Sequence, residues 1–571
     1  MAGKAKGAAT ASVPGLVKDL VDQFSDPLAF YRELIQNSID AGSNRIDVTL
    51  EYDGKTGAAR MAVEDDGEGM DERIIDEYFL VLFRSTKEDD LTKIGKFGVG
   101  IVSVFSLRPD LVRVHTAKAG ESWRLDFPSY KRYEKFRVSA MREGTLVELF
   151  KKMGAGEYPK LAEDSLKTVR FWCKHSDTRI YFHDRRAGGR PQLINEPFTL
   201  PEGESLRHSE EGTEIVLGFT GEPAPFFGFY NKGLTLKEGR KEHFPGVAVK
   251  IKSRYLEHTI TRDNVLEDDN FRKAMAIVKR LAEDELPAKL KAELGEAAQE
   301  IASRAASGLK PEPRLSERWM SRLRYLKWLL GGMFARWKRS DWPIFPSVTG
   351  KAVSLSGIGS ALHESGHALY LAKTADKVAL ALAAKGFPVL VEGPWAAELG
   401  GQWLERGITV RDASTTYIMP SVLPGPKLDA GMRAFLKTLS GMDAGTGAKY
   451  LGIDMANFDY AGSCITDRIF VTQASPGGLS RADERHTPSL FSLWRARGHA
   501  LLNADHPFVR NLAAVHERMP GLAAYMCLKV MHLNDGEVPP DQVGRFSNLA
   551  EKVEAKLLHA ALRLDAPPRA R

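Results

Sequence analysis

The stretch Arg32-Glu33-Leu34-Ile35-Gln36-Asn37-Ser38-Ile39-Asp40-Ala41 organises the chain. Read as a helix, it turns its aliphatic residues towards a core and puts Glu33, Asn37 and Asp40 on a second stripe, at spacings of four and three residues. A carboxylate one turn before a carboxamide can position a water molecule beside a metal ion held by the amide oxygen. The same stripe is also typical of the solvated face of an amphipathic helix. The segments that follow are needed to choose between these two interpretations.

The composition is typical of a globular protein with several domains. The chain has 571 residues, of which 43% are hydrophobic and 27% charged, which predicts about three or four domains. The net charge of +6 is small because 80 basic residues nearly cancel 74 acidic ones. This balance does not demand a nucleic-acid partner and disfavours one. No apolar run approaches the roughly 18 to 20 residues that span a bilayer, so we expect no membrane partner.

The chain ends and the cysteines indicate a cytoplasmic protein. Residues 1–13 lack an apolar core and are expected to form a frayed tail instead of a signal peptide. The three cysteines, Cys173, Cys464 and Cys527, are far apart and odd in number. Such cysteines argue against a disulfide framework and for a reducing compartment.

A Gly-containing turn follows the second of two predicted strands. Residues 47–51 and 59–64 alternate well enough to pair across a turn. The second strand leads into Asp65-Asp66-Gly67-Glu68-Gly69-Met70. The two glycines let the backbone approach a flat ring closely, and Asp65 at the strand end can accept a hydrogen bond from an exocyclic amine. A Gly-rich turn between strand and helix is the alternative.

Residues 83–87 (Phe83-Arg84-Ser85-Thr86-Lys87) come next, and a charged, lid-like segment and a second Gly-rich loop follow them. The loop Ile94-Gly95-Lys96-Phe97-Gly98-Val99-Gly100 opens a predicted helix, where unpaired amides and the helix dipole can hold phosphate. No Rossmann strand precedes it and no P-loop sequence is present, so a dinucleotide fold and a P-loop enzyme are both disfavoured. Residues 143–149 then predict a strand whose Gly144 and Thr145 border the pocket.

These four signals, in this order, resemble the Bergerat-type (GHKL) ATPases, which include DNA gyrase, MutL, sensor histidine kinases and the heat shock protein 90 chaperones. The resemblance implies an ATP-binding α/β sandwich over residues 1–190, with Glu33 as the base, Asn37 holding Mg²⁺, and Asp65 and Thr145 on the adenine side. The residues it assigns to ATP binding are Asn37, Asp40, Asp65, Gly67, Gly69, Met70, Lys87, Gly95, Lys96, Phe97, Gly98, Val99, Gly100 and Thr145.

Within this superfamily, the sequences of the first helix and of the Gly-rich loop resemble those of the heat shock protein 90 family and its bacterial form HtpG. Residues 195–445 would then be an α/β middle domain. Residues 256–266 resemble that family's loop that sends an arginine to the γ-phosphate, which here would be Arg262. MutL and gyrase use a lysine instead. In the alternative reading, Arg262 caps the next helix or pairs with Asp263.

The pentapeptide His363-Glu364-Ser365-Gly366-His367 has the spacing of a zinc-protease motif. Its surroundings resemble a β-α-β unit of the same family, with a helix opening near residue 355, strands at 368–372 and 387–391, and a helix over 379–385. We therefore expect the two histidines to flank a helix-to-strand turn, a geometry that does not suit zinc.

The segment between residues 310 and 342 interleaves tryptophans with basic residues. Its tryptophans are Trp319, Trp328, Trp337 and Trp342, and its basic residues include Arg314, Arg318, Arg322, Arg324, Lys327, Arg336, Lys338 and Arg339. Such a pattern fits a surface for single-stranded nucleic acid or a patch for client proteins. It also fits helices that bury the tryptophans and solvate the charges, which is the more usual arrangement.

Residues 446–571 resemble the small α+β dimerisation domain of the same family. Residues 499–509 carry its strand and His-Pro turn, and helices are predicted at 521–532 and 547–564, the second with an apolar stripe for pairing two copies of the chain. The expected protein is an α+β multidomain homodimer that acts as an ATP-dependent chaperone on non-native client proteins, with ATP and Mg²⁺ as cofactors. The alternatives are a clamp of the MutL or MORC sort on nucleic acid and a nucleotide-binding scaffold with little turnover.

Overall fold

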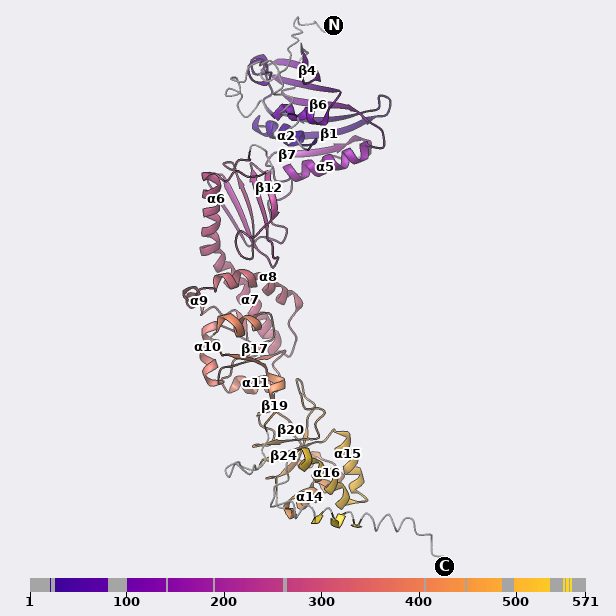
Figure 1. Cartoon of the computed structure of the whole chain (residues 1–571), viewed down its shortest axis with the longest axis vertical. Coiled ribbons are helices and arrows are strands. Elements are labelled where there is room, and N and C mark those ends of the chain that lie inside the picture. The colour runs from indigo at the N-terminus through magenta and orange to yellow at the C-terminus, as the bar shows by residue number, and fades with distance from the viewer. Residues whose placement is uncertain are drawn as a thin grey trace, which may run out of the picture. The chain divides into compact units, whose positions relative to one another are not determined.

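The computed structural model is a mixed α+β multidomain protein (Figure 1). The residues it describes are 21, 26–80, 100–139, 142–187, 190–259, 264–404, 407–446, 449–484, 498–534, 548–549, 551–553 and 555–556. The chain divides into two compact units, Met1–Lys289 and Leu290–Arg571. No helix in the described part has the length and hydropathy needed to cross a bilayer.

The first unit opens with a domain made of one mixed sheet and several helices. Its eight-stranded sheet has the order β5-β4-β3-β6-β2-β1-β7-β8, with β1 and β7 parallel and the other neighbours antiparallel. The strands are β1 Arg45–Asp53, β2 Ala58–Asp65, β3 Leu111–Lys118, β4 Glu121–Ser129, β5 Arg132–Arg137, β6 Gly144–Lys152, β7 Arg179–Asp184 and β8 Gln192–Leu193. The predicted pairing of the first two strands and the predicted strand near 143–149 are both confirmed.

Helical elements cover this sheet. They are α2 Phe30–Asp40, α3 Glu72–Ile74, the π-turn η1 Ile75–Phe79, the 3₁₀ helix η3 Gly100–Leu107, α5 Tyr158–Cys173 and the short 3₁₀ turn η4 Arg185–Ala187. Helix α2 contacts both η3 and α5. It buries Phe30, Tyr31, Leu34 and Ile35 in the domain core. Glu33 is also buried, with 5% of its surface exposed, whereas Asn37 is half-buried and Asp40 is exposed. The stripe therefore starts inside the domain and ends at the surface.

A second sheet completes the first unit. Its order is β12-β11-β13-β10-β9, and helix α6 follows it. The elements are β9 Leu206–Glu210, β10 Thr213–Phe219, β11 Phe226–Asn231, β12 Leu234–Arg240, β13 Val247–Ser253, α6 Asp269–Arg280 and the π-turn η5 Leu281–Glu285. The strands predicted near 226 and 247 are confirmed as β11 and β13. The Asp268 side chain caps α6 by accepting the amide of Phe271, whose ring packs on Phe229 of β11 at 5.2 Å.

The hairpin between β11 and β12 presses against the end of α5. Gly233 at its tip has φ +86°, and a Cβ there would lie 2.0 Å from the carbonyl oxygen of His175. Beside it, the Lys250 ammonium donates to His175 Nε2 at 3.0 Å, while His175 Nδ1 faces the carbonyl oxygen of Glu196 at 3.2 Å. Because a carbonyl can only accept, Nδ1 carries the proton and the ring is neutral. The ATPase domain and the second sheet therefore share a buried polar junction.

The second unit contains a helical segment and a small parallel sheet. Its elements are α7 Leu286–Ala306, α8 Pro313–Leu329, α9 Met333–Arg339, β14 Phe345–Pro346, β15 Ala352–Val353, α10 Leu355–Glu364, β16 Ala368–Ala372, α11 Lys377–Ala384, β17 Val389–Val391, α12 Trp395–Glu398, the π-turn η6 Leu399–Trp403, β18 Thr409–Asp412 and α13 Ala413–Thr416. Strands β17, β16 and β18 form the parallel sheet. The predicted strand-helix-strand order around residues 368–391 is confirmed.

The histidine pair lies at the turn that leads into this sheet. His363 is on α10, which ends at Glu364, and Gly366 and His367 both have a left-handed backbone, with φ +61° and +62°. The two histidines therefore do not share one continuous helix, as the motif for zinc requires. Within the described residues, no three His, Cys, Asp or Glu side chains gather as metal ligands.

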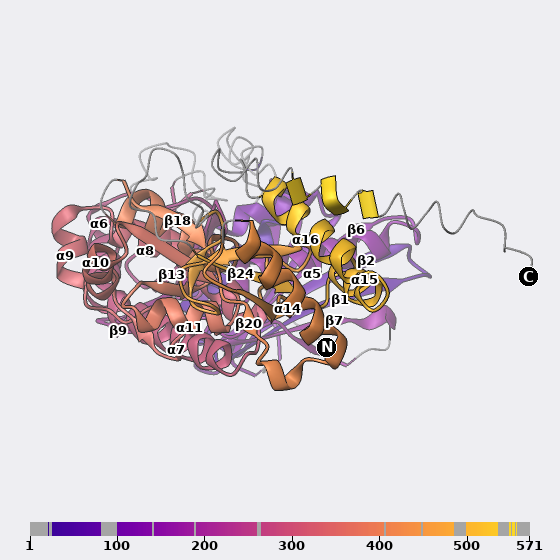
Figure 2. The same cartoon turned by 90° about the horizontal axis from the view of Figure 1, so that it is seen from below.

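The remaining described elements of the second unit form a small α/β subdomain. Its elements are β19 Tyr417–Ile418, β20 Ser421–Val422, the 3₁₀ turn η7 Gly425–Lys427, α14 Ala430–Gly445, β21 Ile453–Asn457, β22 Phe470–Gln473, β23 Ser480–Arg481, β24 His499–Asn503, α15 Pro507–His516 and α16 Pro520–Asn534. Helices α14, α15 and α16 gather beside the sheet β20-β21-β24-β22 and share its core (Figure 2). The predicted helix at 521–532 is confirmed as α16, and the predicted helix at 547–564 lies mostly outside the described residues.

The buried His175 should make the stability of the first unit depend on pH. Burial, together with the nearby Lys250 charge, lowers the pKa of His175 from about 6.5 to about 4. The unfolded chain therefore binds a proton between these values and the folded one does not, so stability is full above pH 6.5 and falls towards pH 4, by up to about 3 kcal/mol. We expect His175→Gln, which keeps an acceptor for Lys250 but does not titrate, to flatten this part of the profile.

The measurement is calorimetric unfolding between pH 7 and pH 4.5, with His208→Gln on β9 as the matched control. An unchanged profile in His175→Gln would show that other groups cause the pH dependence.

Candidate nucleotide site

Asp65 is the last residue of β2 and lies at the centre of the candidate site. Its carboxylate accepts hydrogen bonds from the Ser38 hydroxyl at 2.7 Å and from the backbone amides of Gly67 at 3.0 Å and Thr145 at 3.2 Å. Burial raises the pKa of Asp65, and these hydrogen bonds partly offset that rise. The carboxylate is therefore held in one orientation, with acceptor capacity left for a ligand amine.

Two glycines beside Asp65 allow backbone segments to approach closely. Gly69 has φ +66°, and a Cβ there would lie 2.1 Å from the carbonyl oxygen of Ala117. Gly144 has φ +127°, and a Cβ there would lie 2.2 Å from the carbonyl oxygen of Asp65. Any side chain at either position would push β2, β3 and β6 apart. The predicted turn is thus a compact wall beside the Asp65 carboxylate.

Hydroxyl side chains tie this wall together. The amide of Met70 donates to the buried Thr116 hydroxyl at 2.8 Å, and Thr116 and Thr145 share a hydrogen bond of 3.1 Å. Sequence reasoning predicted Thr145 but missed Thr116 and Ser38. Ser38 belongs to the predicted first helix, but its position among aliphatic residues gives no sign of a binding role. Thr116 lies in a strand that carries no motif. Only the tertiary structure shows that both side chains lie close to Asp65.

Glu33 and Asn37 form a second cluster with Gly100. A Cβ added to Gly100 would lie 3.0 Å from Glu33 Oε2 and 3.8 Å from Asn37 Nδ2. The first residue of η3 is therefore packed against the polar stripe of α2. These side chains offer carboxylate and amide oxygens, the ligand types that Mg²⁺ prefers. The structure brings these three residues together, and their roles in catalysis and in metal and phosphate binding stay predictions.

Asp40, the last residue of the stripe, was predicted to bind ATP, but in the structure it pairs with a lysine of the second sheet. Its carboxylate forms an ion pair with the Lys232 ammonium at 2.7 Å. Lys232 sits at the tip of the β11–β12 hairpin and has a left-handed backbone, with φ +46°. The end of helix α2 is thus linked to the second sheet. Sequence reasoning did not select Lys232, because nothing local to residue 232 indicates a contact with residue 40.

The described base of the loop that follows β13 is also near α2. Thr259 and Asn264 close the base of this loop through a backbone hydrogen bond of 2.9 Å. Burial lowers the pKa of His258, and the neighbouring charge of Arg32 on α2 lowers it further. Arg32 is itself buried, with its guanidinium 4.5 Å from the ring centre of Trp172, and burial lowers its pKa to about 10. His258 at the base of the predicted arginine loop therefore lies within electrostatic range of the helix that carries Glu33.

Several predicted site residues lie outside the described part of the chain. They are Arg262 in the loop after β13, Lys87, and the loop residues Gly95, Lys96, Phe97, Gly98 and Val99. Gly67, next to Asp65, is described and buried. Its Cβ position would lie 2.6 Å from the Ser43 hydroxyl. The structure thus describes the two ends of the predicted pocket, around Asp65 and around Glu33.

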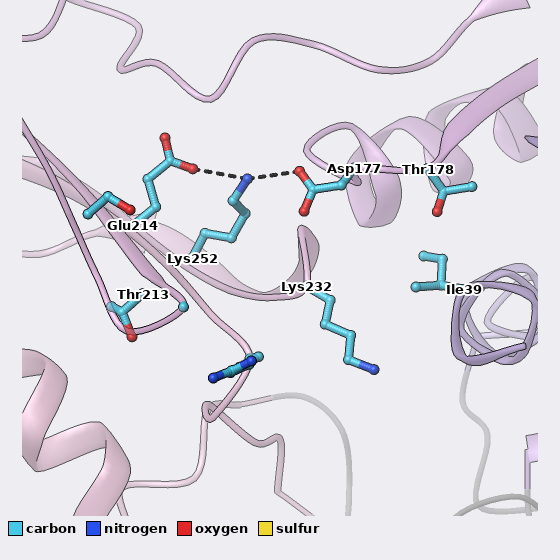
Figure 3. A pocket seen from close by; sticks show the side chains of 10 residues that line it. Ile39, Asp177, Thr178, Thr213, Glu214, Lys232 and Lys252 are labelled. Carbon is cyan, nitrogen blue, oxygen red and sulfur yellow. Dashed lines mark hydrogen bonds and ion pairs between the residues drawn. The ribbon is translucent and has the colours of Figure 1, made fainter. Parts of the chain in front are cut away.

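A cavity of about 390 Å³ lies between the ATPase domain and the second sheet (Figure 3). The Lys252 ammonium points between Asp177, at 3.1 Å, and Glu214, at 3.0 Å. Lys232 and Ile39 also line the cavity. The acidic and basic groups here largely neutralise one another, so the cavity acts as part of the junction and is separate from the predicted adenine side.

Comparisons with known proteins agree on the N-terminal domain. Residues 31–145 match the family described as "Histidine kinase-, DNA gyrase B-, and HSP90-like ATPase". DNA mismatch repair protein MutL of Pseudomonas aeruginosa is 31% identical over 131 residues, 22% of this chain and 20% of that protein. MutL of Rhodospirillum rubrum is 38% identical over 106 residues, 17% of this chain and 16% of that protein.

The chain therefore carries an ATPase domain of the GHKL type at its N-terminus. The matched region spans about a fifth or less of the length of these MutL relatives. Their names support the superfamily and do not support the narrower expectation of an HtpG-like chaperone.

Gly69→Ala should abolish nucleotide binding, because its methyl group cannot fit 2.1 Å from the Ala117 carbonyl. The matched control is Gly42→Ala, which has a similar φ of +76° but no atom within 4 Å of the new Cβ. The control should cost about 1–2 kcal/mol for the left-handed backbone alone and keep its affinity for ATP. Titration with a fluorescent ATP analogue and thermal unfolding measure the two effects. Equal affinities in the two variants would contradict the proposed wall.

Asp65→Asn should weaken ATP binding by tenfold to about a hundredfold, since a hydrogen bond to a charged group contributes about 1.5–3 kcal/mol. The amide would turn a donor towards the adenine amine. Asp66→Asn is the matched control, since Asp66 accepts the amides of Asn44 and Arg45 at 2.8 and 2.9 Å instead. Isothermal titration with ATP compares the two variants, and an Asp65→Asn protein that binds as tightly as the wild type would mean that the adenine contact lies elsewhere.

Proposed function

We propose that this protein is a Mg²⁺-dependent ATPase whose nucleotide cycle opens and closes a clamp. The observation that carries the proposal is the position of α2, which holds Glu33 and Asn37 beside Gly100 and also ends in the ion pair between Asp40 and Lys232. One helix is therefore connected both to the hydrolytic groups and to the second sheet. A change at the nucleotide can be transmitted along it.

The described residues fit ATP and Mg²⁺. The fixed Asp65 carboxylate suits the adenine amine, and the Asn37 amide oxygen would hold Mg²⁺ against the phosphates. Bound Mg²⁺ would neutralise charge on the phosphates. Glu33, with 5% exposure, would orient or deprotonate the attacking water, since a general base must lie within hydrogen-bond reach of it.

Arg262 is the proposed cation from the second domain. His258, at the described base of its loop, lies within electrostatic range of Arg32 on α2, the helix that carries Glu33. An arginine stabilises phosphoryl charge strongly when it docks. Lys232, already joined to Asp40, is a second cation on the same side.

The nucleic-acid form of the clamp is favoured by the relatives, which are named DNA mismatch repair proteins. The chaperone form is favoured by a different observation: the strand-helix-strand unit at 368–391 and the His-Pro turn after β24 follow the order of the heat shock protein 90 resemblance. In either form, dimerisation through residues 446–571 would let two copies enclose a substrate.

Glu33→Ala should retain ATP affinity and lose at least tenfold in turnover, about 1.4 kcal/mol in the barrier, because the water loses its orienting group. Steady-state ATP hydrolysis and equilibrium ATP binding are measured on the full chain. The matched control is Glu51→Ala on β1, an exposed carboxylate that pairs with Arg60 at 3.4 Å. Wild-type turnover in Glu33→Ala would remove the basis of the proposal.

A further inference from the structure

The positive charge of the chain is concentrated in one segment of the second unit. Between Leu309 and Trp342 there are nine Lys and Arg residues and three acidic ones, a net charge of +6. The remaining 71 basic and 71 acidic residues cancel, so this segment accounts for the whole net charge of +6. The net charge of the whole chain is small, but this segment produces a local positive potential that attracts polyanions.

Exposed apolar side chains gather on the same two helices. Met333 is 84% exposed, Trp337 73%, Met320 54% and Trp328 37%. Met320, Arg324 and Trp328 are spaced by four residues on α8 and share one face. Helix α9 begins three residues beyond Leu330, after two glycines, and carries Met333 and Trp337.

Other side chains of the segment lie in the core of the second unit. On the opposite face of α8, Trp319 is fully buried and packs on Trp395 at 5.2 Å and on Phe345 at 5.8 Å. The interpretation that these helices bury their tryptophans is thus correct for Trp319 and wrong for Trp328 and Trp337. Two large exposed aromatic rings on a basic surface mark an interaction site.

Five of the nine basic residues of the segment differ clearly in whether they form an ion pair. Arg322 pairs with Glu293 at 2.8 Å and Lys327 with Glu398 at 2.8 Å, so their charges are neutralised within the unit. Arg314, Arg318 and Lys338 are exposed and form no ion pair with any described residue. We call the surface made by these three cations with Met320, Trp328, Met333 and Trp337 the α8–α9 patch.

We propose that the α8–α9 patch binds single-stranded nucleic acid. Unpaired cations attract the phosphate backbone, and the exposed tryptophans offer flat faces on which unpaired bases stack, a contribution of about 1–3 kcal/mol per base. A duplex keeps its bases stacked internally and cannot use these faces. A non-native protein supplies apolar side chains but no regular row of negative charges. This inference rests on the nucleic-acid form of the proposed function and names its contact surface.

The test measures fluorescence anisotropy of the full chain with 20-nucleotide oligo-dT and oligo-U, a 20-base-pair duplex, poly-glutamate and a denatured protein. We expect the single strands to bind most tightly, with affinity falling as salt rises. Trp337→Ala should weaken this binding by about 5-fold to 150-fold, and Trp337→Phe should restore part of it. The matched control is Tyr78→Ala, which removes an aromatic ring that is 57% exposed outside the patch.

The combined variant Arg314→Ala, Arg318→Ala and Lys338→Ala should lower the slope of log affinity against log salt by about 2, since each phosphate contact on a single strand contributes about 0.7. The basic control is Lys167→Ala on α5, an exposed lysine paired with Glu163 at 2.6 Å. Circular dichroism verifies that every variant is folded. Unchanged binding by Trp337→Ala and an unchanged slope would overturn the assignment of the patch.

Two other results would also overturn it. Equal affinity for poly-glutamate would indicate a surface for any anion, and preference for the denatured protein would indicate a client surface. ATP hydrolysis measured on the same samples separates the two hypotheses. Patch variants that still bind nucleic acid leave the clamp intact and refute the patch, whereas a wild-type protein without ATPase activity refutes the proposed function itself.

Discussion

The pairing of β2 with β6 at Asp65 and Thr145 is the constraint on which the rest of the candidate site depends. Gly144 lets the two backbones approach, and Gly69 lets the following turn close against β3. In this arrangement the Asp65 carboxylate receives two backbone amides and the Ser38 hydroxyl, so its orientation is set by the sheet and by α2 together. A buried acceptor held this way loses little entropy when a ligand amine arrives.

Helix α2 connects this wall to the second sheet. Its Ser38 reaches Asp65, its Glu33 and Asn37 meet Gly100, and its Asp40 reaches Lys232. The His175–Lys250 contact beside the same junction is buried and neutral on the histidine side, so it tolerates little rearrangement without breaking. Helix α2 therefore links the candidate nucleotide site to the second sheet through side chains that contact one another, which is the physical connection that the proposed coupling requires.

The choice between the two forms of the clamp depends on a different part of the molecule. The matched ATPase domain is shared by proteins with several substrates, so it does not select one of them. The segment from 309 to 342 does carry selective chemistry, since its charge is concentrated and its aromatic rings are exposed. A near-neutral total charge led the composition alone to disfavour a nucleic-acid partner, because a sum does not record where charges lie.

The sequence by itself determined the elements whose signal is local. The strand pair β1–β2, the turn with Gly67 and Gly69, the strand-helix-strand unit around β16 and the helix α16 follow from alternation, glycine spacing and apolar periodicity within a few residues. Only the tertiary structure decided that Glu33 is buried, that Asp40 pairs with Lys232, that Thr116 and Ser38 support Asp65, and that Trp319 is buried while Trp337 is exposed. These properties depend on which distant segments pack together, and a local pattern carries no record of its partner across the fold.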